Sequence, residues 1–260
     1  MTNALSAATC AIYAVLVIPV LYLLVRHGRY GLLGWLFLFF FCSLRIIGGA
    51  LAVHDTSIAA NIISSIGLSP LLLATSGILH EARHYRIQSL DKKLEWASVL
   101  AYHILVVAGV ALTAAGSAKL QQHEQPLDKA EKITKAGISI LAVAWGVLAG
   151  WVGLSFIAPR RRNSSLTSAG TVLLTAVTFS LAFIGIRVFY SVAALCTQRA
   201  SLNPITGSLA VRVVLGFLPE VIATLLYIIA GIRTQGAALL ANVDEETVSR
   251  RPKPRAQPWV

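Results

Sequence analysis

The stretch FLFFFCSLRIIGGAL, residues 37–51, is apolar along its whole length except for Ser43 and Arg45. It belongs to an apolar run over 31–53, which is long enough to cross a bilayer as a helix, since about 20 residues span the hydrocarbon. An arginine at the centre of such a helix costs about 2.5–3.5 kcal/mol to insert. Arg45 is therefore expected to face the interior of a helical bundle and to pair there with another polar group.

Six further apolar runs of similar length follow along the chain. Of its 260 residues, 56% are hydrophobic and only 13% are charged, whereas a soluble domain has about 25% charged residues. Backbone polar groups in lipid must be hydrogen-bonded within the protein, which favours helices. We therefore predict an all-α, polytopic membrane protein, a bundle of seven transmembrane helices over 4–25, 31–53, 57–79, 95–116, 136–157, 170–195 and 209–231.

The basic residues are divided unevenly between the two sides of this predicted bundle. Of the 22 Lys and Arg residues, 14 lie in the segments on one side, five on the other and three within spans. The positive-inside rule then places the N-terminus outside and the C-terminus in the cytosol. Residues 1–235 are expected to form the helix domain, and 236–260 a disordered basic cytosolic tail near anionic lipid headgroups. An endomembrane such as the endoplasmic reticulum is favoured, and nucleic acid is not expected as a partner.

Three arginines lie inside the predicted spans and one glutamate lies deep within them, and at helical spacing these residues share faces with aromatic residues. Residues three or four apart lie on one side of a helix. Glu220 is the only acid predicted to lie deep within any span. If the faces of three spans converge, they form one polar site from Arg45 of the second span, Phe183, Arg187 and Tyr190 of the sixth, and Arg212 and Glu220 of the seventh.

Two interpretations of this site remain open. In the first, Glu220 bridges the arginines in a structural ion-pair network, because polar groups buried in membranes often serve packing. In the second, three arginines against one glutamate leave a surplus of positive charge, which would attract a phosphate, carboxylate or phenolate group. Asp55, at the outer end of the second span, would then face the same mouth of the bundle.

The segment HEARHYR, 80–86, lies at the cytosolic end of the third predicted span. We predict a solvated cluster at the membrane edge, in which Glu81 pairs with Arg83 or with basic loop residues. His80 and His84 have the i,i+4 spacing of two metal ligands, but no third ligand follows at a suitable spacing. Neither a metal nor a cofactor is therefore expected.

The sequence also resembles known membrane families. The segments RHGRYGLLGWLFLFFFCSLRIIGGAL, GIRVFYSVAAL and LPEVIATLLY resemble a family of fungal seven-span membrane proteins identified by a domain-of-unknown-function label, which implies the same architecture and a fungal source. Arg187 with Tyr190, followed by Glu220, is similar to the late-span pattern of the lipid-translocating-exporter-like family. That family has a second acid where this chain has Ala193 and Ala194.

Integral-membrane terpene cyclases of fungal secondary-metabolite clusters are similar small seven-span chains. This resemblance implies an enzyme of meroterpenoid biosynthesis that cyclises an isoprenoid substrate within the bilayer by acid initiation. Two acids, Glu220 and Asp55, are the catalytic candidates, because burial in hydrocarbon favours the neutral, proton-donating form of a carboxyl group. The other residues of the site would bind the substrate through its head group or by cation–π contacts: Arg45, Arg187, Arg212, Tyr190 and Phe183.

Two alternative functions use the same residues. A lipid or small-molecule translocator, or a resistance protein, would hold an anionic head group at the cationic site. A seven-span receptor or scaffold would bind cytosolic partners through its basic tail. The expected small-molecule partner is an apolar isoprenoid or lipid-like compound, together with the lipids of the membrane.

Overall fold

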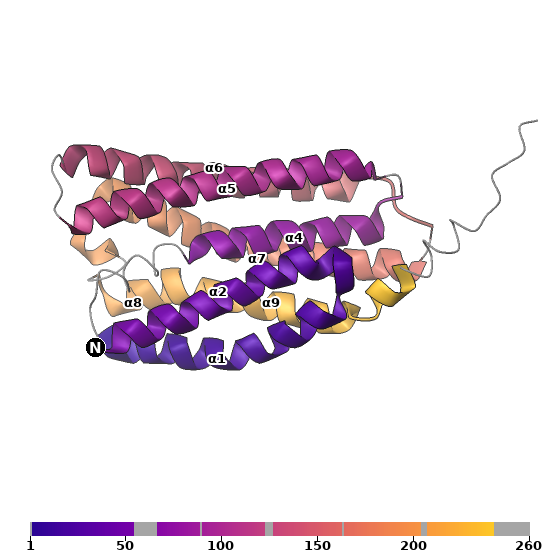
Figure 1. Ribbon diagram of the computed structural model, residues 1–260, viewed down its shortest axis with the longest axis horizontal. Helices are drawn as coiled ribbons and strands as arrows, with labels where there is room; N and C mark the ends of the chain where they lie inside the picture. The colour runs from indigo at the N-terminus through magenta and orange to yellow at the C-terminus, as the bar shows by residue number, and fades with distance from the viewer. Residues whose placement is uncertain are drawn as a thin grey trace, which may run out of the picture.

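The computed structural model describes residues 2–54, 67–88, 90–122, 127–162, 164–203 and 207–241, which are mostly helical. The helices are α1 (Thr2–Arg26), α2 (Gly28–His54), α4 (Leu68–Arg86), α5 (Lys92–Gln121), α6 (Leu127–Ile157), α7 (Ser164–Thr197), η1 (Ala200–Leu202), α8 (Leu209–Val211), η2 (Arg212–Phe217) and α9 (Leu218–Thr234). The long helices run side by side, and the N-terminus and the end of α9 lie at opposite ends of the bundle (Figure 1).

Within the described part of the chain, six helical segments are long and apolar enough to cross a membrane: α1, α2, α5, α6, α7 and the continuous segment from α8 through η2 to α9. Their outer faces expose large apolar side chains, including Val25 at 77% and Ile157 at 83% of their surface. Extended apolar surface of this kind is unfavourable in water. The prediction of an all-α, multi-pass membrane protein is confirmed.

Helix α4 lies where the third span was predicted, but its composition and bounds differ from that prediction. Of the predicted range 57–79, residues 57–66 lie outside the described part of the chain. The second half of α4 carries Glu81, Arg83 and Arg86, so the helix lacks the composition of a lipid-exposed span. Every residue of α4 except Arg83 is buried, among α2, α5, α6 and α7. Its polar side chains therefore contact protein instead of lipid.

Helices α1 and α2 are joined at a sharp corner. Gly28 has a φ of 62°, a left-handed conformation that glycine adopts without the steric penalty of a Cβ. The chain reverses direction there, and the two helices pack against each other. His27, the residue before the glycine, is fully buried. The corner therefore brings an imidazole into the bundle.

Two glycines allow α2 and α4 to approach closely. A Cβ at Gly77 would lie 2.4 Å from the backbone nitrogen of Gly34, and a Cβ at Gly34 would lie 2.6 Å from that of Ile78. The GxxxG motif formed by Gly146 and Gly150 of α6 predicts a similar approach, but no atom of the described residues lies within 4 Å of a Cβ at either position. That prediction is wrong, because both glycines lie on the exposed face of α6.

Replacing Gly77 by alanine tests the close contact. The added methyl group would clash with backbone atoms of α2, and overpacking of this kind costs about 1–3 kcal/mol. We expect Gly77→Ala to lower the Tm of the detergent-solubilised protein, measured by circular dichroism. Gly146→Ala, at an open helical position, should keep or slightly raise the Tm, since alanine is the better helix former. Equal Tm values for the two variants would contradict the packing of α2 on α4.

Candidate functional site

An ionic cluster of three residues lies inside the bundle, toward the end that holds the N-terminus. Glu220 of α9 lies between Arg45 of α2 and Arg187 of α7. Arg45 Nη2 and Arg187 Nε both donate hydrogen bonds to Glu220 Oε1, the second over 2.9 Å. The exposed fractions of Arg45, Arg187 and Glu220 are only 9%, 7% and 3%. The predicted convergence of the three helix faces is therefore confirmed for these residues, and the ionic cluster ties α2, α7 and α9 together.

The orientation of Glu220 depends on an irregular turn just before it. Helix η2 is a π-helix, and the N–H of Leu218 bonds to the carbonyl of Val213, five residues earlier. Pro219 has no N–H to continue this pattern, and the chain returns to an α-helix in α9. A π-turn holds one extra residue, which rotates the following side chains by roughly 100° about the helix axis. The turn therefore sets the direction in which Glu220 points.

Tyr190 lies beside the ionic cluster. Its side chain is buried, and its ring centroid lies 5.7 Å from the Arg187 guanidinium carbon, within cation–π range. Arg187 Nη1 also donates a hydrogen bond to Ser191 Oγ. Arg187 is thus held by a carboxylate, a hydroxyl and an aromatic ring, all of which restrict its orientation.

The other predicted site residues are not part of the cluster. Arg212 is half-buried and makes no ion pair with any residue that the structure describes. Phe183 is half-buried and makes no ring contact within the described ranges. Asp55 lies outside the described residues.

The ionic cluster has more positive than negative charge. Two guanidinium groups, which stay protonated in proteins, face one carboxylate. Arg45 Nε and the Tyr190 hydroxyl are buried without a hydrogen-bond partner among the described residues. Buried charged and polar groups are normally paired, because leaving them unpaired is costly. The cluster therefore carries one surplus positive charge and two buried polar groups without a hydrogen-bond partner among the described residues.

A second buried network lies at the opposite end of the bundle. Glu81 of α4 accepts hydrogen bonds from Trp35 Nε1 over 3.1 Å and from the Tyr85 hydroxyl over 2.9 Å. Glu81 Oε1 also lies 2.6 Å from His27 Nδ1. The other ring nitrogen of His27, Nε2, donates over 3.0 Å to the carbonyl of Gly231 in α9, because a carbonyl can only accept. The side chains of this His27–Glu81 network are completely buried.

The His27–Glu81 network corrects two sequence-based predictions. Glu81 is not part of a solvated cluster at the membrane edge, and Glu220 is not the only acid deep within the bundle. Because α4 is buried, it turns Glu81 inward, while Arg83 forms two hydrogen bonds of 2.8 and 2.9 Å to Glu95 instead. One feature of the sequence could have indicated this network: His27 is a titratable residue that precedes a glycine between two apolar runs.

Helix α9 carries polar groups along its buried face from one network to the other. Thr224 Oγ1 donates to the backbone carbonyl of Glu220 over 2.8 Å, and the Tyr227 hydroxyl lies 2.8 Å from Thr75 Oγ1 of α4. From Glu220 to Gly231 the helix rises roughly 16 Å, at 1.5 Å per residue. Helix α9 is therefore held by a polar contact at each end and by another between them.

The fold and this ionic site define a polytopic helical membrane protein with charged networks buried in its bundle. The chain belongs to the family described as "Domain of unknown function (DUF7702)", which it matches over residues 1–237. No curated protein matches the chain. The crystal structure of Exiguobacterium sibiricum rhodopsin is similar, with 12% sequence identity and a TM-score of 0.44, over 93% of this chain and 98% of that chain. Likeness at this level does not bear on activity.

These comparisons confirm the predicted membership of a domain-of-unknown-function family, while a fungal source stays a prediction. The predicted function as a terpene cyclase is wrong, and the family that the chain matches is described only as a domain of unknown function. The geometry supplies the physical reason. Glu220, the proposed proton donor, accepts hydrogen bonds from two guanidinium groups on one oxygen. It acts as their counter-ion and is not a free acid that could protonate an olefin.

Neutralising Glu220 tests the electrostatic nature of the cluster. Glu220→Gln leaves two buried guanidinium groups without a counter-ion, and breaking a buried pair in this way costs about 3–5 kcal/mol. We expect a correspondingly large decrease in the free energy of unfolding in mixed micelles. Glu131→Gln, which removes a partly exposed pair with Lys135, should leave that free energy nearly unchanged. Similar effects of both substitutions would argue against a buried ionic cluster.

Proposed function

We propose that this protein is a seven-span membrane receptor for an anionic amphiphile, whose acid group binds at the ionic cluster and whose binding moves α9. The observation that carries the proposal is the way α9 is held. Glu220 anchors one end of the helix to two arginines, and the carbonyl of Gly231 accepts a hydrogen bond from His27 at the other. A change at the first contact is thus mechanically connected to the second.

The class of ligand follows from the charge and the position of the cluster. Arg45 and Arg187 exceed Glu220 by one positive charge, and Arg212 is a half-buried cation in the same membrane-spanning segment as Glu220. Carboxylate and phosphate groups match the planar donors of a guanidinium. Because the outer surface of the bundle is apolar, a ligand that enters from the bilayer needs a hydrocarbon body. This chemistry agrees with the lipid-like partner predicted from the sequence.

Competition between the ligand's acid group and Glu220 for the two arginines would couple ligand binding to the movement of α9. A ligand can shift a conformational equilibrium only by as much as its affinities for the two states differ. An anion binds Arg45 and Arg187 well only where Glu220 has released them, so it favours the state in which α9 is free. The π-helix η2 holds one extra residue, and π-turns are frequent at functional sites; loss of this turn on binding would rotate α9 relative to His27.

A receptor with this arrangement needs α4 as a third crossing. Its 19 residues rise roughly 28 Å, close to the hydrocarbon thickness of about 30 Å. Burial among other helices explains how α4 tolerates charged residues at that depth. Arg83, Arg86 and Arg233 lie toward the end of the bundle opposite the N-terminus, which supports a cytosolic location for that end. The basic segment 236–260 would then face cytosolic partners; its residues 242–260 lie outside the described part.

Distance measurements between spin labels on α5 and α9 test the proposed motion. The labels would be attached through Lys93→Cys and Arg233→Cys in the full chain in lipid nanodiscs, with the native Cys10, Cys42 and Cys196 replaced by alanine. We expect oleate to shift the distance distribution by at least about 1.5 Å, the rise of one helical residue. Oleyl alcohol, which has the same hydrocarbon chain without the charge, should leave the distribution unchanged.

Substitutions of arginine provide the matched controls. Arg45→Gln should abolish the response to oleate, and Arg45→Lys, which keeps the charge, should retain part of it. Arg29→Ala removes an exposed cation at the other end of the bundle and should have no effect. The proposal fails if oleate produces no shift, if oleyl alcohol produces the same shift, or if Arg45→Gln responds like the unmodified chain.

A further inference from the structure

The hydrogen bonds of the His27–Glu81 network require one proton between these two side chains. His27 Nε2 carries a hydrogen, because it donates to the carbonyl of Gly231 over 3.0 Å. The other ring nitrogen, Nδ1, lies 2.6 Å from Glu81 Oε1. Two lone pairs repel at that distance, so a hydrogen lies between these atoms. The pair is therefore either an imidazolium with a carboxylate or a neutral imidazole with a carboxylic acid.

Removal of that proton breaks one of the two contacts of His27. A neutral imidazole has a single N–H group, which can donate to Glu81 or to the Gly231 carbonyl but not to both. A hydrogen bond to a carboxylate is roughly twice as strong as one between neutral groups, so the hydrogen stays on Nδ1. Nε2 then turns a lone pair toward the Gly231 carbonyl oxygen. The contact that ties α9 to the corner between α1 and α2 is lost.

Protein encloses the His27–Glu81 pair. Both side chains have 0% of their surface exposed. The backbone of Gly31 closes one side, since a Cβ there would lie 2.5 Å from His27 Cβ and 2.8 Å from Glu81 Oε2. Bulk water therefore cannot replace a hydrogen bond that the pair loses. The repulsion between His27 Nε2 and the Gly231 carbonyl is relieved by movement of α9.

The charged and titratable groups of α1, α2 and α9 at this end of the bundle have surroundings of their own. The cations on the adjoining helix ends are exposed: Arg26, Arg29 and Arg233. Tyr30 of α2 stacks on His84 of α4, with ring centroids 3.8 Å apart. Tyr227, one turn before Gly231 in α9, is hydrogen-bonded to Thr75. These groups are therefore solvated or in contact with other side chains.

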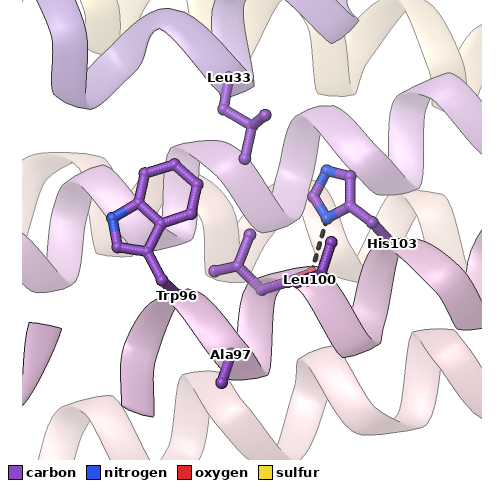
Figure 2. Close-up of a pocket in the computed structure, with 6 residues that line it drawn as sticks. Leu33, Trp96, Ala97, Leu100 and His103 are labelled. Atoms are coloured by element: carbon purple, nitrogen blue, oxygen red, sulfur yellow. Dashed lines mark hydrogen bonds between the residues drawn. The ribbon is translucent and has the colours of Figure 1, made fainter. Parts of the chain in front are cut away.

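The acid and the imidazole of α5 also have partners. Glu95 accepts two hydrogen bonds from Arg83 and lies 3.4 Å from His80. His103 donates through Nδ1 over 2.7 Å to a carbonyl of its own helix (Figure 2). Arg86 of α4 donates to a carbonyl oxygen of α6, and the part of α7 before the ionic cluster has no titratable side chain. The proton of the network is therefore held by the pair itself.

We infer that the His27–Glu81 pair is a proton-binding site that controls the attachment of α9. With the proton bound, His27 donates to both Glu81 and the Gly231 carbonyl. When the proton passes to water, His27 stays bonded to Glu81 and releases Gly231, and no bond between heavy atoms is made or broken. The ligand and the position of this site differ from those of the ionic cluster, and no anion has to bind there.

Spin labels on either side of the contact test this control. They would be attached through Arg29→Cys and Arg233→Cys, both exposed positions, in the full chain in nanodiscs with the native cysteines replaced by alanine. The distance between the labels would be followed by electron paramagnetic resonance between about pH 5 and about pH 10, above most carboxylates and below most lysines. We expect it to increase in one step, from about 10% to about 90% complete over about two pH units, the steepness of a single proton.

Glu81→Gln is the matched control. Its amide N–H would donate to Nδ1 of a neutral His27, and its amide oxygen would accept from Trp35, so both contacts of His27 persist without a titrating proton. The labels should then stay at the shorter distance across the whole pH range. A labelled chain with native Glu81 that shows no step below about pH 10, or a Glu81→Gln variant with the same step, would overturn the inference.

The ring nitrogens of histidine decide the case in which Glu81→Gln does not fold. In the chain labelled with ¹⁵N-histidine, nuclear magnetic resonance should show one ring that loses the hydrogen on Nε2 and keeps the one on Nδ1, at the pH where the spin labels move apart. If no ring makes this change at that pH, the inference is overturned. Oleate is absent from these measurements, so their outcome is independent of the proposed response to an anion.

Discussion

Glu220 holds two arginines from two other helices, and the arrangement of the bundle depends on this contact. Without the carboxylate, Arg45 and Arg187 would be buried charges with no partner, which a low-dielectric interior does not tolerate. Both guanidinium groups bond to the same oxygen, so α2 and α7 are fixed relative to α9 through one atom. Because one carboxylate faces two guanidinium groups, a net positive charge remains inside the bundle. That charge makes the cluster a candidate site for an anion as well as a packing contact.

Polar contacts of α9 and α4 connect the ionic cluster to the opposite end of the bundle. The π-turn of η2 orients Glu220, the hydroxyl pair of Tyr227 and Thr75 joins α9 to α4, and the carbonyl of Gly231 meets His27 at the far end. Polar residues are concentrated on the buried faces, while the outer helices present apolar side chains to lipid. The ionic cluster and the His27–Glu81 network are therefore joined by one helix, α9.

The sequence predicts the ionic cluster well because a charge within a long apolar run has few favourable positions. Arg45, Arg187 and Glu220 were found on that basis alone. Arg212 was predicted on the same helical face as Glu220, but it is half-buried and makes no ion pair with the residues that the structure describes. The contact between His27 and Glu81 joins residues 54 positions apart, and neither lies within a purely apolar run, so hydropathy gives no sign of their burial. That burial follows from the central position of α4, which only the packing of the other helices determines.

A double-mutant cycle between Arg45 and Glu220 measures the central interaction most directly. The free energy of unfolding would be determined in mixed micelles for Arg45→Met, Glu220→Met and the double variant, since methionine keeps much of the side-chain volume. A direct buried ion pair predicts a coupling energy of at least about 1.5 kcal/mol, with the double variant more stable than the sum of the single losses implies. Additivity within about 0.3 kcal/mol would show that the two side chains do not interact, and would contradict the ionic cluster.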